Sequence, residues 1–172
     1  VCTDAIYFDR TFNAAHYIQS KDRIHRIGMK DDTKVTYHIF RSTYPPVDTN
    51  LLQALSIISQ VRKISSRTFA IIPYMGYARQ DKQFLSGEVI TMSVVAKMLQ
   101  SAGAKKVIVV DIHSNTALNH FNIPTENISA VPELANYFKK LNLKNPLVVS
   151  PDMGGSSRSK KFASLLKTDF IV

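Results

Sequence analysis

The 172-residue sequence has almost no cysteine and no long apolar run, and we expect no secretory leader from its first residues. Its one cysteine, Cys2, excludes an intrachain disulfide and fits a reducing compartment. No apolar run approaches the roughly 20 residues that cross a bilayer, and Val1–Arg10 lacks a basic start followed by an apolar region. We therefore expect a cytoplasmic protein with no membrane partner.

The chain also lacks the phosphate-binding loop G-x-x-x-x-G-K-[ST], internal repeats and low-complexity segments. The missing loop argues against a P-loop motor. Hydrophobic residues make up 45% of the chain and charged residues 20%, which is typical of a globular protein. The length is sufficient for one domain with a substantial core.

Strand-like and helix-like segments alternate along the chain. The expected strands are Lys34–Phe40, Thr68–Tyr74, Lys106–Asp111, Pro146–Ser150 and Asp169–Val172. The expected helices are one capped by Asp48 or Thr49, then Val89–Ser101, Pro132–Leu141 and Ser156–Leu166, with a short turn at Thr116–Phe121. This alternation predicts an α/β fold with a mostly parallel sheet and helices on both faces.

The spacing of apolar residues predicts which helix faces point inward. The first helix should bury Leu51, Leu52, Leu55, Ile58 and Val61. The second should bury Val94, Val95, Met98 and Leu99, and Gly103 should end it.

Polar and charged residues follow three of the expected strands directly. They are Arg79, Gln80, Asp81 and Lys82, then Asp111 and His113, then Asp152, Gly154 and Gly155. Ligands of open α/β sheets bind outside the carboxyl ends of strands, so we expect all three groups at one edge of one sheet. Basic side chains bind phosphate oxygens, carboxylates bind Mg²⁺, and glycines let backbone N–H groups approach an anion. The set suits a metal-bound polyphosphate.

Five motifs in this order and spacing resemble ribose-phosphate pyrophosphokinase over Ser42–Val172. They are STYPPVDTNLLQAL, PYMGYARQDKQ, GEVITMSVVAKML, VVDIHS and VSPDMGG. The resemblance implies transfer of a pyrophosphoryl group from ATP to ribose 5-phosphate, which yields phosphoribosyl pyrophosphate and AMP. It also implies Mg²⁺ as cofactor and a homo-oligomer.

The resemblance implies roles for the residues at the strand ends. Arg79, Gln80, Asp81 and Lys82 would contact ATP. His113 and Asp111 would lie at a Mg²⁺ site, and Asp152 with Gly154 and Gly155 would form a second Mg²⁺ site beside ribose 5-phosphate. Some relatives have acidic metal contacts at the positions of Asn122 and Glu126 in this chain. Because Asn122 carries no charge, we expect no further metal site there.

The resemblance leaves both ends of the family pattern unmatched. The acidic motif that relatives have before residue 42 is missing. Relatives continue into a second domain that carries catalytic basic residues, so we expect the carboxyl-terminal domain and the catalytic residues to be absent. The alternative function is a non-catalytic module that binds ATP or mediates assembly.

Val1–Arg41 resembles instead the last motif of superfamily-two helicases of the chromatin-remodelling type. The likeness is carried by Gln19, Asp22, Arg23, His25, Arg26 and Gly28. It predicts a boundary near Phe40–Ser42, with a helicase-like segment 1–41 and a pyrophosphokinase-like domain 42–172. A fragment of a DNA-dependent ATPase is therefore a further alternative.

The net charge of +9 is concentrated after this boundary. Val1–Arg41 carries a net charge of +2 and Ser42–Val172 carries +7. Such an excess accompanies either nucleic acids or acidic small molecules. Because it lies in the pyrophosphokinase-like segment, we expect ATP and ribose 5-phosphate as partners rather than nucleic acid.

Overall fold

The computed structural model describes residues 4–8, 35–65 and 67–172. The chain divides into two compact units, Val1–Ile128 and Ser129–Val172. Among the described residues, no helix combines the length and hydropathy that a membrane span requires.

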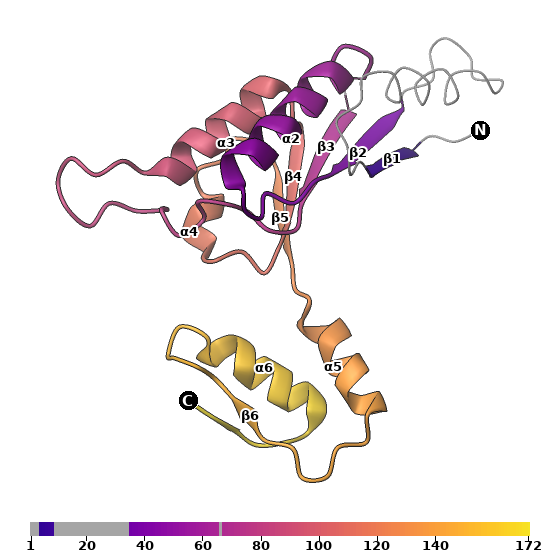
Figure 1. Cartoon of the computed structure of the whole chain (residues 1–172), viewed down its shortest axis with the longest axis vertical. Coiled ribbons are helices and arrows are strands. Elements are labelled where there is room, and N and C mark those ends of the chain that lie inside the picture. The colour runs from indigo at the N-terminus through magenta and orange to yellow at the C-terminus, as the bar shows by residue number, and fades with distance from the viewer. Residues whose placement is uncertain (1–3, 9–34, 66) are drawn as a thin grey trace. The chain divides into compact units, whose positions relative to one another are not determined.

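The first unit is built on a five-stranded, wholly parallel sheet (Figure 1). Its strands are β1 (Asp4–Phe8), β2 (Thr36–Phe40), β3 (Arg67–Ile72), β4 (Lys106–Val110) and β5 (Thr125–Ile128). They lie side by side in chain order. Within the described residues, the helices that connect successive strands are α2 (Val47–Val61), α3 (Thr91–Ala102) and the short α4 (Asn115–Leu118). The predicted α/β class with a parallel sheet is confirmed.

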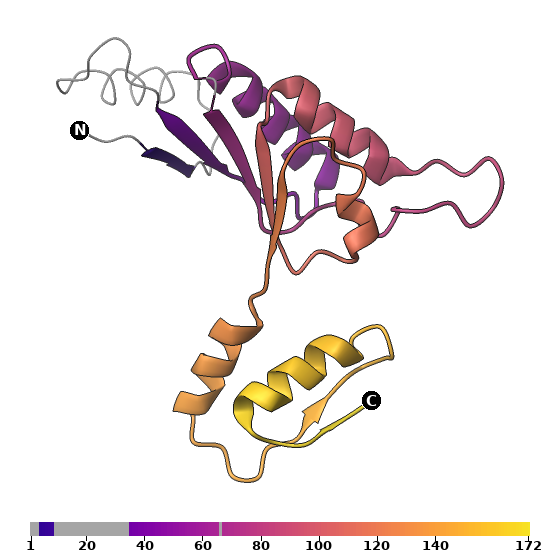
Figure 2. The same ribbon diagram turned by 180° about the vertical axis from the view of Figure 1, so that it is seen from behind.

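Helices α2 and α3 pack against each other on one face of this sheet, as Figure 1 and the reverse view in Figure 2 show. Crossovers between parallel strands are right-handed. When each new strand is added on the same side of the previous one, the connecting helices therefore fall on the same face. Within residues 35–65 and 67–128, helices α2 and α3 cover one face of the sheet. The prediction of helices on both faces is therefore confirmed for one face only.

The core lies between this sheet face and the two helices. Alternate strand residues such as Ile39, Ile72 and Val109 pack with Ile58 of α2 and Leu99 of α3. The opposite face carries a row of cross-strand contacts instead. The ring of Phe69 packs edge-on against His38 at 5.4 Å and lies beneath the Lys106 ammonium, which pairs with Glu126 at 2.6 Å.

Helix α2 differs from its prediction at its start and on one face. Pro46 occupies the N-cap position and no side chain caps the helix, so the predicted cap by Asp48 or Thr49 is wrong. The Asp48 carboxylate accepts a hydrogen bond from the Tyr77 hydroxyl instead. Leu52 is 65% exposed, because it lies off the stripe that faces the sheet.

Helix α3 begins at Thr91 and buries Met92, Val95, Ala96 and Leu99. Val94 and Met98 are 45% and 40% exposed, so their predicted inward position is wrong. Both residues lie off the buried stripe of α3, and Met98 lines an open surface groove with Leu55 and Ser59 of α2, so only the stripe through Val95 and Leu99 reaches the core. Gly103 ends the helix with φ 121, a conformation that glycine adopts without strain, as predicted.

The second unit contains α5 (Val131–Lys140), β6 (Val148–Val149), α6 (Ser156–Leu166) and β7 (Phe170–Ile171). Strands β6 and β7 form their own parallel pair, and Phe138 of α5 packs edge-on against Phe162 of α6 at 5.7 Å. The prediction that Pro146–Ser150 joins the sheet of the other strands is wrong. Only two residues of that segment pair, between prolines at 146 and 151, and their partner is the strand that directly follows α6.

Candidate functional site

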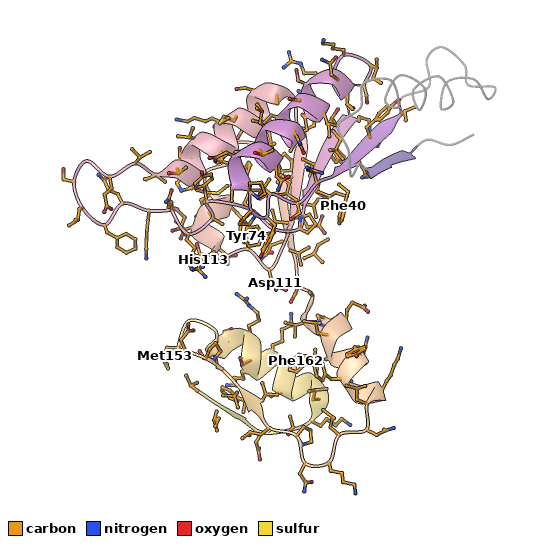
Figure 3. All side chains as sticks on the ribbon, viewed as in Figure 1. Phe40, Tyr74, Asp111, His113, Met153 and Phe162 are labelled. Carbon is orange, nitrogen blue, oxygen red and sulfur yellow. The ribbon has the colours of Figure 1, made fainter. Side chains whose placement is uncertain are left out.

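The loops after β3 and β4 leave the first sheet at the same edge. The two strands are adjacent and parallel, and Ile72 pairs with Val109 near their carboxyl ends. Figure 3 shows Tyr74, Asp111 and His113 at this edge. The predicted convergence of these two loops is therefore confirmed for the first unit.

The loop after β3 is anchored where it begins. The Thr43 hydroxyl donates to the Tyr74 carbonyl at 2.7 Å and accepts from the Gly76 N–H at 2.7 Å. A Cβ at position 76 would lie 2.4 Å from Cγ1 of Val47. Glycine is therefore needed here for close packing, and the loop leaves the sheet along a defined path.

Tyr77 makes the next fixed point of the loop. Its φ of 63 is in the left-handed region, and its hydroxyl donates to Oδ1 of Asp48 at 2.5 Å. The hydrogen bond to Asp48 raises the pKa of Tyr77, with smaller contributions from desolvation and from the Asp48 charge. The bond ties the loop to the first turn of α2.

The four predicted ATP residues divide into three exposed side chains and one buried one. Arg79, Gln80 and Lys82 are exposed, whereas Asp81 is only 4% exposed. The carboxylate of Asp81 accepts a hydrogen bond from the Ser114 hydroxyl, and its backbone carbonyl lies 2.6 Å from Nε2 of His120. The Asp81 side chain is therefore engaged by the segment that follows β4.

The rest of this loop protrudes as an excursion of the chain, and hydrogen bonds hold it together at its base, or neck, and at its tip. At its neck, the Met92 N–H donates to the Gln80 carbonyl at 3.1 Å. At its tip, Oε2 of Glu88 accepts from the N–H groups of Phe84 and Leu85 at 2.8 Å and 3.0 Å. The hydrogen bond from Leu85, followed by the one from Phe84, lowers the pKa of Glu88 against a small opposing desolvation.

The excursion also carries a cation beside an exposed ring. The ammonium of Lys82 lies 4.9 Å from the centre of the Phe84 ring. This cation–π contact holds the Lys82 ammonium over the ring. With Arg79, it gives the exposed surface of the loop two positive charges, which suits an anionic ligand.

The segment after β4 carries the two candidate metal ligands. Asp111 is half-buried with φ 43, and its N–H donates to the Ile128 carbonyl at 2.9 Å. His113 is exposed, and Ser114 caps α4 by accepting from the Ala117 N–H. Within the described residues, no group of three or more His, Cys, Asp or Glu side chains could hold a metal by itself. The Asp111 carboxylate is a ligand of the kind that Mg²⁺ takes together with substrate phosphates and waters, and the His113 imidazole can hold a metal-bound water.

The predicted ribose-phosphate residues belong to the second unit. Asp152 and Gly154 are exposed, and Oδ1 of Asp152 accepts the Gly155 N–H at 2.7 Å. The Ser150 hydroxyl donates to the Asp152 carbonyl at 2.8 Å, which tightens the turn before α6. The Gly155 N–H that was predicted to meet an anion is thus used by Asp152 here. Proximity of Asp152 to His113 stays a prediction.

Other predicted residues fall elsewhere. The helicase-like residues Gln19–Gly28 lie outside the described residues. Asn122 is exposed and its N–H donates to Gln100 at 2.9 Å, while the Glu126 carboxylate pairs with Lys106.

The structure adds positioning residues that sequence reasoning missed, chiefly Ser114, His120 and Thr43. A serine directly before a short helix is a signal for an N-cap, so Ser114 could have been assigned that role. The partners of His120 and Thr43 are distant in sequence, and no local pattern indicates them.

A parallel sheet with polar loops at its carboxyl edge places this chain in the α/β class, whose open sheets generally bind ligands at that edge. The particular family follows from comparison. Residues 16–103 match the family model for the N-terminal domain of ribose phosphate pyrophosphokinase, and the chain belongs to this family. The match runs across residue 41, and a domain boundary there stays a prediction.

Individual relatives agree with this assignment. The chain is 41% identical to a ribose-phosphate pyrophosphokinase of Bacillus caldolyticus over 135 residues, covering 78% of this chain and 43% of the relative. It is 36% identical to that of Methanobrevibacter smithii over 156 residues, covering 87% and 52%. A crystal structure of phosphoribosylpyrophosphate synthetase from Mycobacterium smegmatis matches with a TM-score of 0.71 and 30% identity, covering 80% of this chain and 47% of the other. The chain thus spans about half the length of these relatives.

Proposed function

We propose that the protein to which this chain contributes transfers the pyrophosphoryl group of ATP to ribose 5-phosphate, and that the described residues supply the ATP side of the site. The observation that carries this proposal is the contact between Asp81 and Ser114. It joins the loop with Arg79 and Lys82 to the loop with His113, at the edge where ligands of parallel sheets bind. The names of the relatives support the reaction.

The exposed side chains of the first loop would bind ATP. The Arg79 guanidinium can form two parallel hydrogen bonds to phosphate oxygens, and Lys82 adds a second positive charge. Gln80 can donate and accept at the edge of the adenine or ribose. Together they would hold the triphosphate beside the end of β4.

His113 and Asp111 would hold Mg²⁺ that enters with ATP. The residues fit the ion because Mg²⁺ is usually bound by one or two carboxylates together with substrate phosphates and waters, so Asp111 would ligate it and His113 would hold a metal-bound water. The ion would neutralise the phosphate charge that grows during transfer. Pyrophosphoryl transfer depends mainly on positioning and charge stabilisation, so these residues would contribute by holding the reactants.

Asp152, Gly154 and Gly155 would bind ribose 5-phosphate and a second Mg²⁺. The phosphate would take the Gly155 N–H, which now donates to Asp152. This exchange would release the Asp152 carboxylate for the metal. In a chain that also carries the catalytic half, Asp152→Ala should abolish turnover. By family resemblance, we also propose a homo-oligomeric protein of the cytoplasm.

The first test is ATP binding by the 172-residue chain, measured by calorimetry with excess Mg²⁺. Arg79→Ala should weaken binding about tenfold, because a charge-assisted pair contributes roughly 1.5 kcal/mol or more. Lys97→Ala, which removes an exposed lysine from α3, is the matched control and should leave binding unchanged. Absence of ATP binding, or equal effects of both substitutions, would refute the proposed site.

The alternative function is a non-catalytic module that binds ATP or mediates assembly. The names of the Bacillus and Methanobrevibacter relatives favour the pyrophosphokinase over this module. Formation of AMP from ATP and ribose 5-phosphate separates the two functions. A chain that binds ATP but forms no AMP, even with equimolar carboxyl-terminal half of a relative, would be the module.

A further inference from the structure

We propose that Ser114 and His120 are positioning residues that lock Asp81, and with it the Arg79–Lys82 segment, against the loop that carries His113. This inference rests on the proposed function for its consequence, while the lock itself can be tested without any ligand. Ser114 and His120 flank the short helix α4 on either side. Both donate to the same residue of the neighbouring loop.

Asp81 is held at two different atoms. Its side-chain Oδ2 accepts the Ser114 hydroxyl, and its backbone carbonyl oxygen lies 2.6 Å from His120 Nε2. Because a carbonyl oxygen only accepts, Nε2 of His120 must carry a proton. With the side chain and the main chain both engaged, rotation of the residue breaks at least one bond.

The burial of Asp81 makes its hydrogen bonds necessary for stability. Asp81 is 4% exposed, so its carboxylate has little water to replace a lost partner. A buried carboxylate without a donor is strongly destabilised. The Ser114 hydroxyl in turn accepts the Ala117 N–H at 3.4 Å, so the same oxygen that donates to Asp81 caps α4. Local order of α4 and the placement of Asp81 are therefore coupled.

The lock acts on the exposed residues through the backbone. Gln80 and Lys82 are the immediate neighbours of Asp81, and the Gln80 carbonyl also closes the neck of the excursion through Met92. Fixing Asp81 limits the range over which Gln80 and Lys82 can move relative to His113. Pre-organised binding groups lose less conformational entropy when the ligand arrives. The lock should thus increase ATP affinity without touching ATP.

Paired substitutions test the lock in the full chain by amide hydrogen exchange without ligand. Ser114→Ala and His120→Leu remove a donor, whereas Ser114→Thr and His120→Gln keep one. The first pair should speed exchange of the hydrogen-bonded amides of Gln80 and Met92, which donate to the carbonyls of Tyr77 and Gln80, about tenfold, the loss expected for one hydrogen bond to a charged or buried partner. The second pair should stay within about twofold of the parent chain. Thr116→Ala, on the exposed side of α4, is the control and should change nothing.

The same variants are then compared in ATP binding. Ser114→Ala and His120→Leu should weaken binding about as much as they speed exchange, and the donor-retaining variants should restore it. If the parent chain binds no ATP while the exchange pattern holds, the lock stands and the proposed function fails. If exchange of the β4 amides at Val107 and Val109 rises as much as that of the loop, the substitutions merely destabilise the unit and the lock is refuted.

One measurement needs no substitution. Long-range ¹H–¹⁵N spectra of the parent chain should show His120 with a proton on Nε2 that exchanges slowly with solvent. A neutral ring protonated on Nδ1 alone could not donate to the Asp81 carbonyl and would overturn the proposal.

Discussion

Gly76→Ala is the substitution whose effect follows most directly from the structure. The φ of Gly76 lies outside the left-handed region, so alanine meets no backbone strain there. Its new Cβ would lie 2.4 Å from Cγ1 of Val47 and 3.2 Å from the Thr43 carbonyl oxygen. Both neighbours are held, since Val47 begins α2 and Thr43 anchors the loop. The cost should therefore be steric.

The magnitude follows from two opposing terms. Overpacking of this kind costs about 1–3 kcal/mol. Replacing glycine with alanine returns about 0.4–1 kcal/mol, because the unfolded chain becomes less flexible. We expect a net loss of about 1–2 kcal/mol in the free energy of unfolding, measured by urea denaturation followed by far-UV circular dichroism.

A double-mutant cycle isolates the cause. Val47→Ala removes the atom that clashes, so the double variant should be more stable than the sum of the single effects by about 1 kcal/mol. Gly87→Ala is the contrasting control, because Gly87 has φ 89 and a Cβ added there would meet no atom within 4 Å. It should lose about 1 kcal/mol through backbone strain and show no coupling to Val47. Strict additivity of Gly76→Ala and Val47→Ala would refute the steric explanation.

Three further predictions address α3 and the titrating groups of the site. Leu99→Ala, at a fully buried position, should lower the free energy of unfolding by about 2–5 kcal/mol in the same urea assay, whereas Met98→Ala, at a position 40% exposed, should lower it by less than about 1 kcal/mol. Similar losses would mean that the inward face of α3 is misassigned. Because its hydrogen bonds lower the pKa of Glu88, the loop tip should be closed above the usual carboxyl pKa and should open as pH falls through the lowered pKa. The amide chemical shifts of Phe84 and Leu85 report this transition, and Glu88→Gln should abolish it. Because the hydrogen bond to Asp48 raises the pKa of Tyr77, this bond should hold below the usual tyrosine pKa and be lost as pH rises through the raised pKa. Asp48→Asn should shift the tyrosinate absorbance of Tyr77 to lower pH, and an unchanged titration would contradict the contact.

Much of the element order could be predicted from the sequence because its signals are local. Strands β1 and β5 were not predicted, and β5, a short polar strand at the edge of the sheet, has no apolar run to indicate it. Apolar runs of strand length and the helix-ending Gly103 lie within short windows, and the structure confirms them at β3, β4 and α6. Errors arose where a second element decides. Leu52, Val94 and Met98 fit an apolar periodicity, yet the sheet covers only one stripe of each helix.

The candidate site was predictable in composition and only partly in geometry. Motif positions led to Arg79, Lys82 and His113, which do follow adjacent strands. The same reasoning treated Asp81 as one more ligand-facing residue, whereas its carboxylate is buried against Ser114. A four-residue motif shows which side chains are charged, but not which of them turn inward.

The sequence by itself determined the class of fold, the strands and helices with strong apolar patterns, and the family, because periodicity and ordered motifs are properties of the chain. Tertiary structure alone decided the partners of Asp81, which lie 33 and 39 residues further along, and the separate pairing of β6 with β7. The physical reason is that backbone preference acts over a few residues. Contacts across a sheet depend instead on which strands become neighbours and on which polar groups burial forces to find a partner.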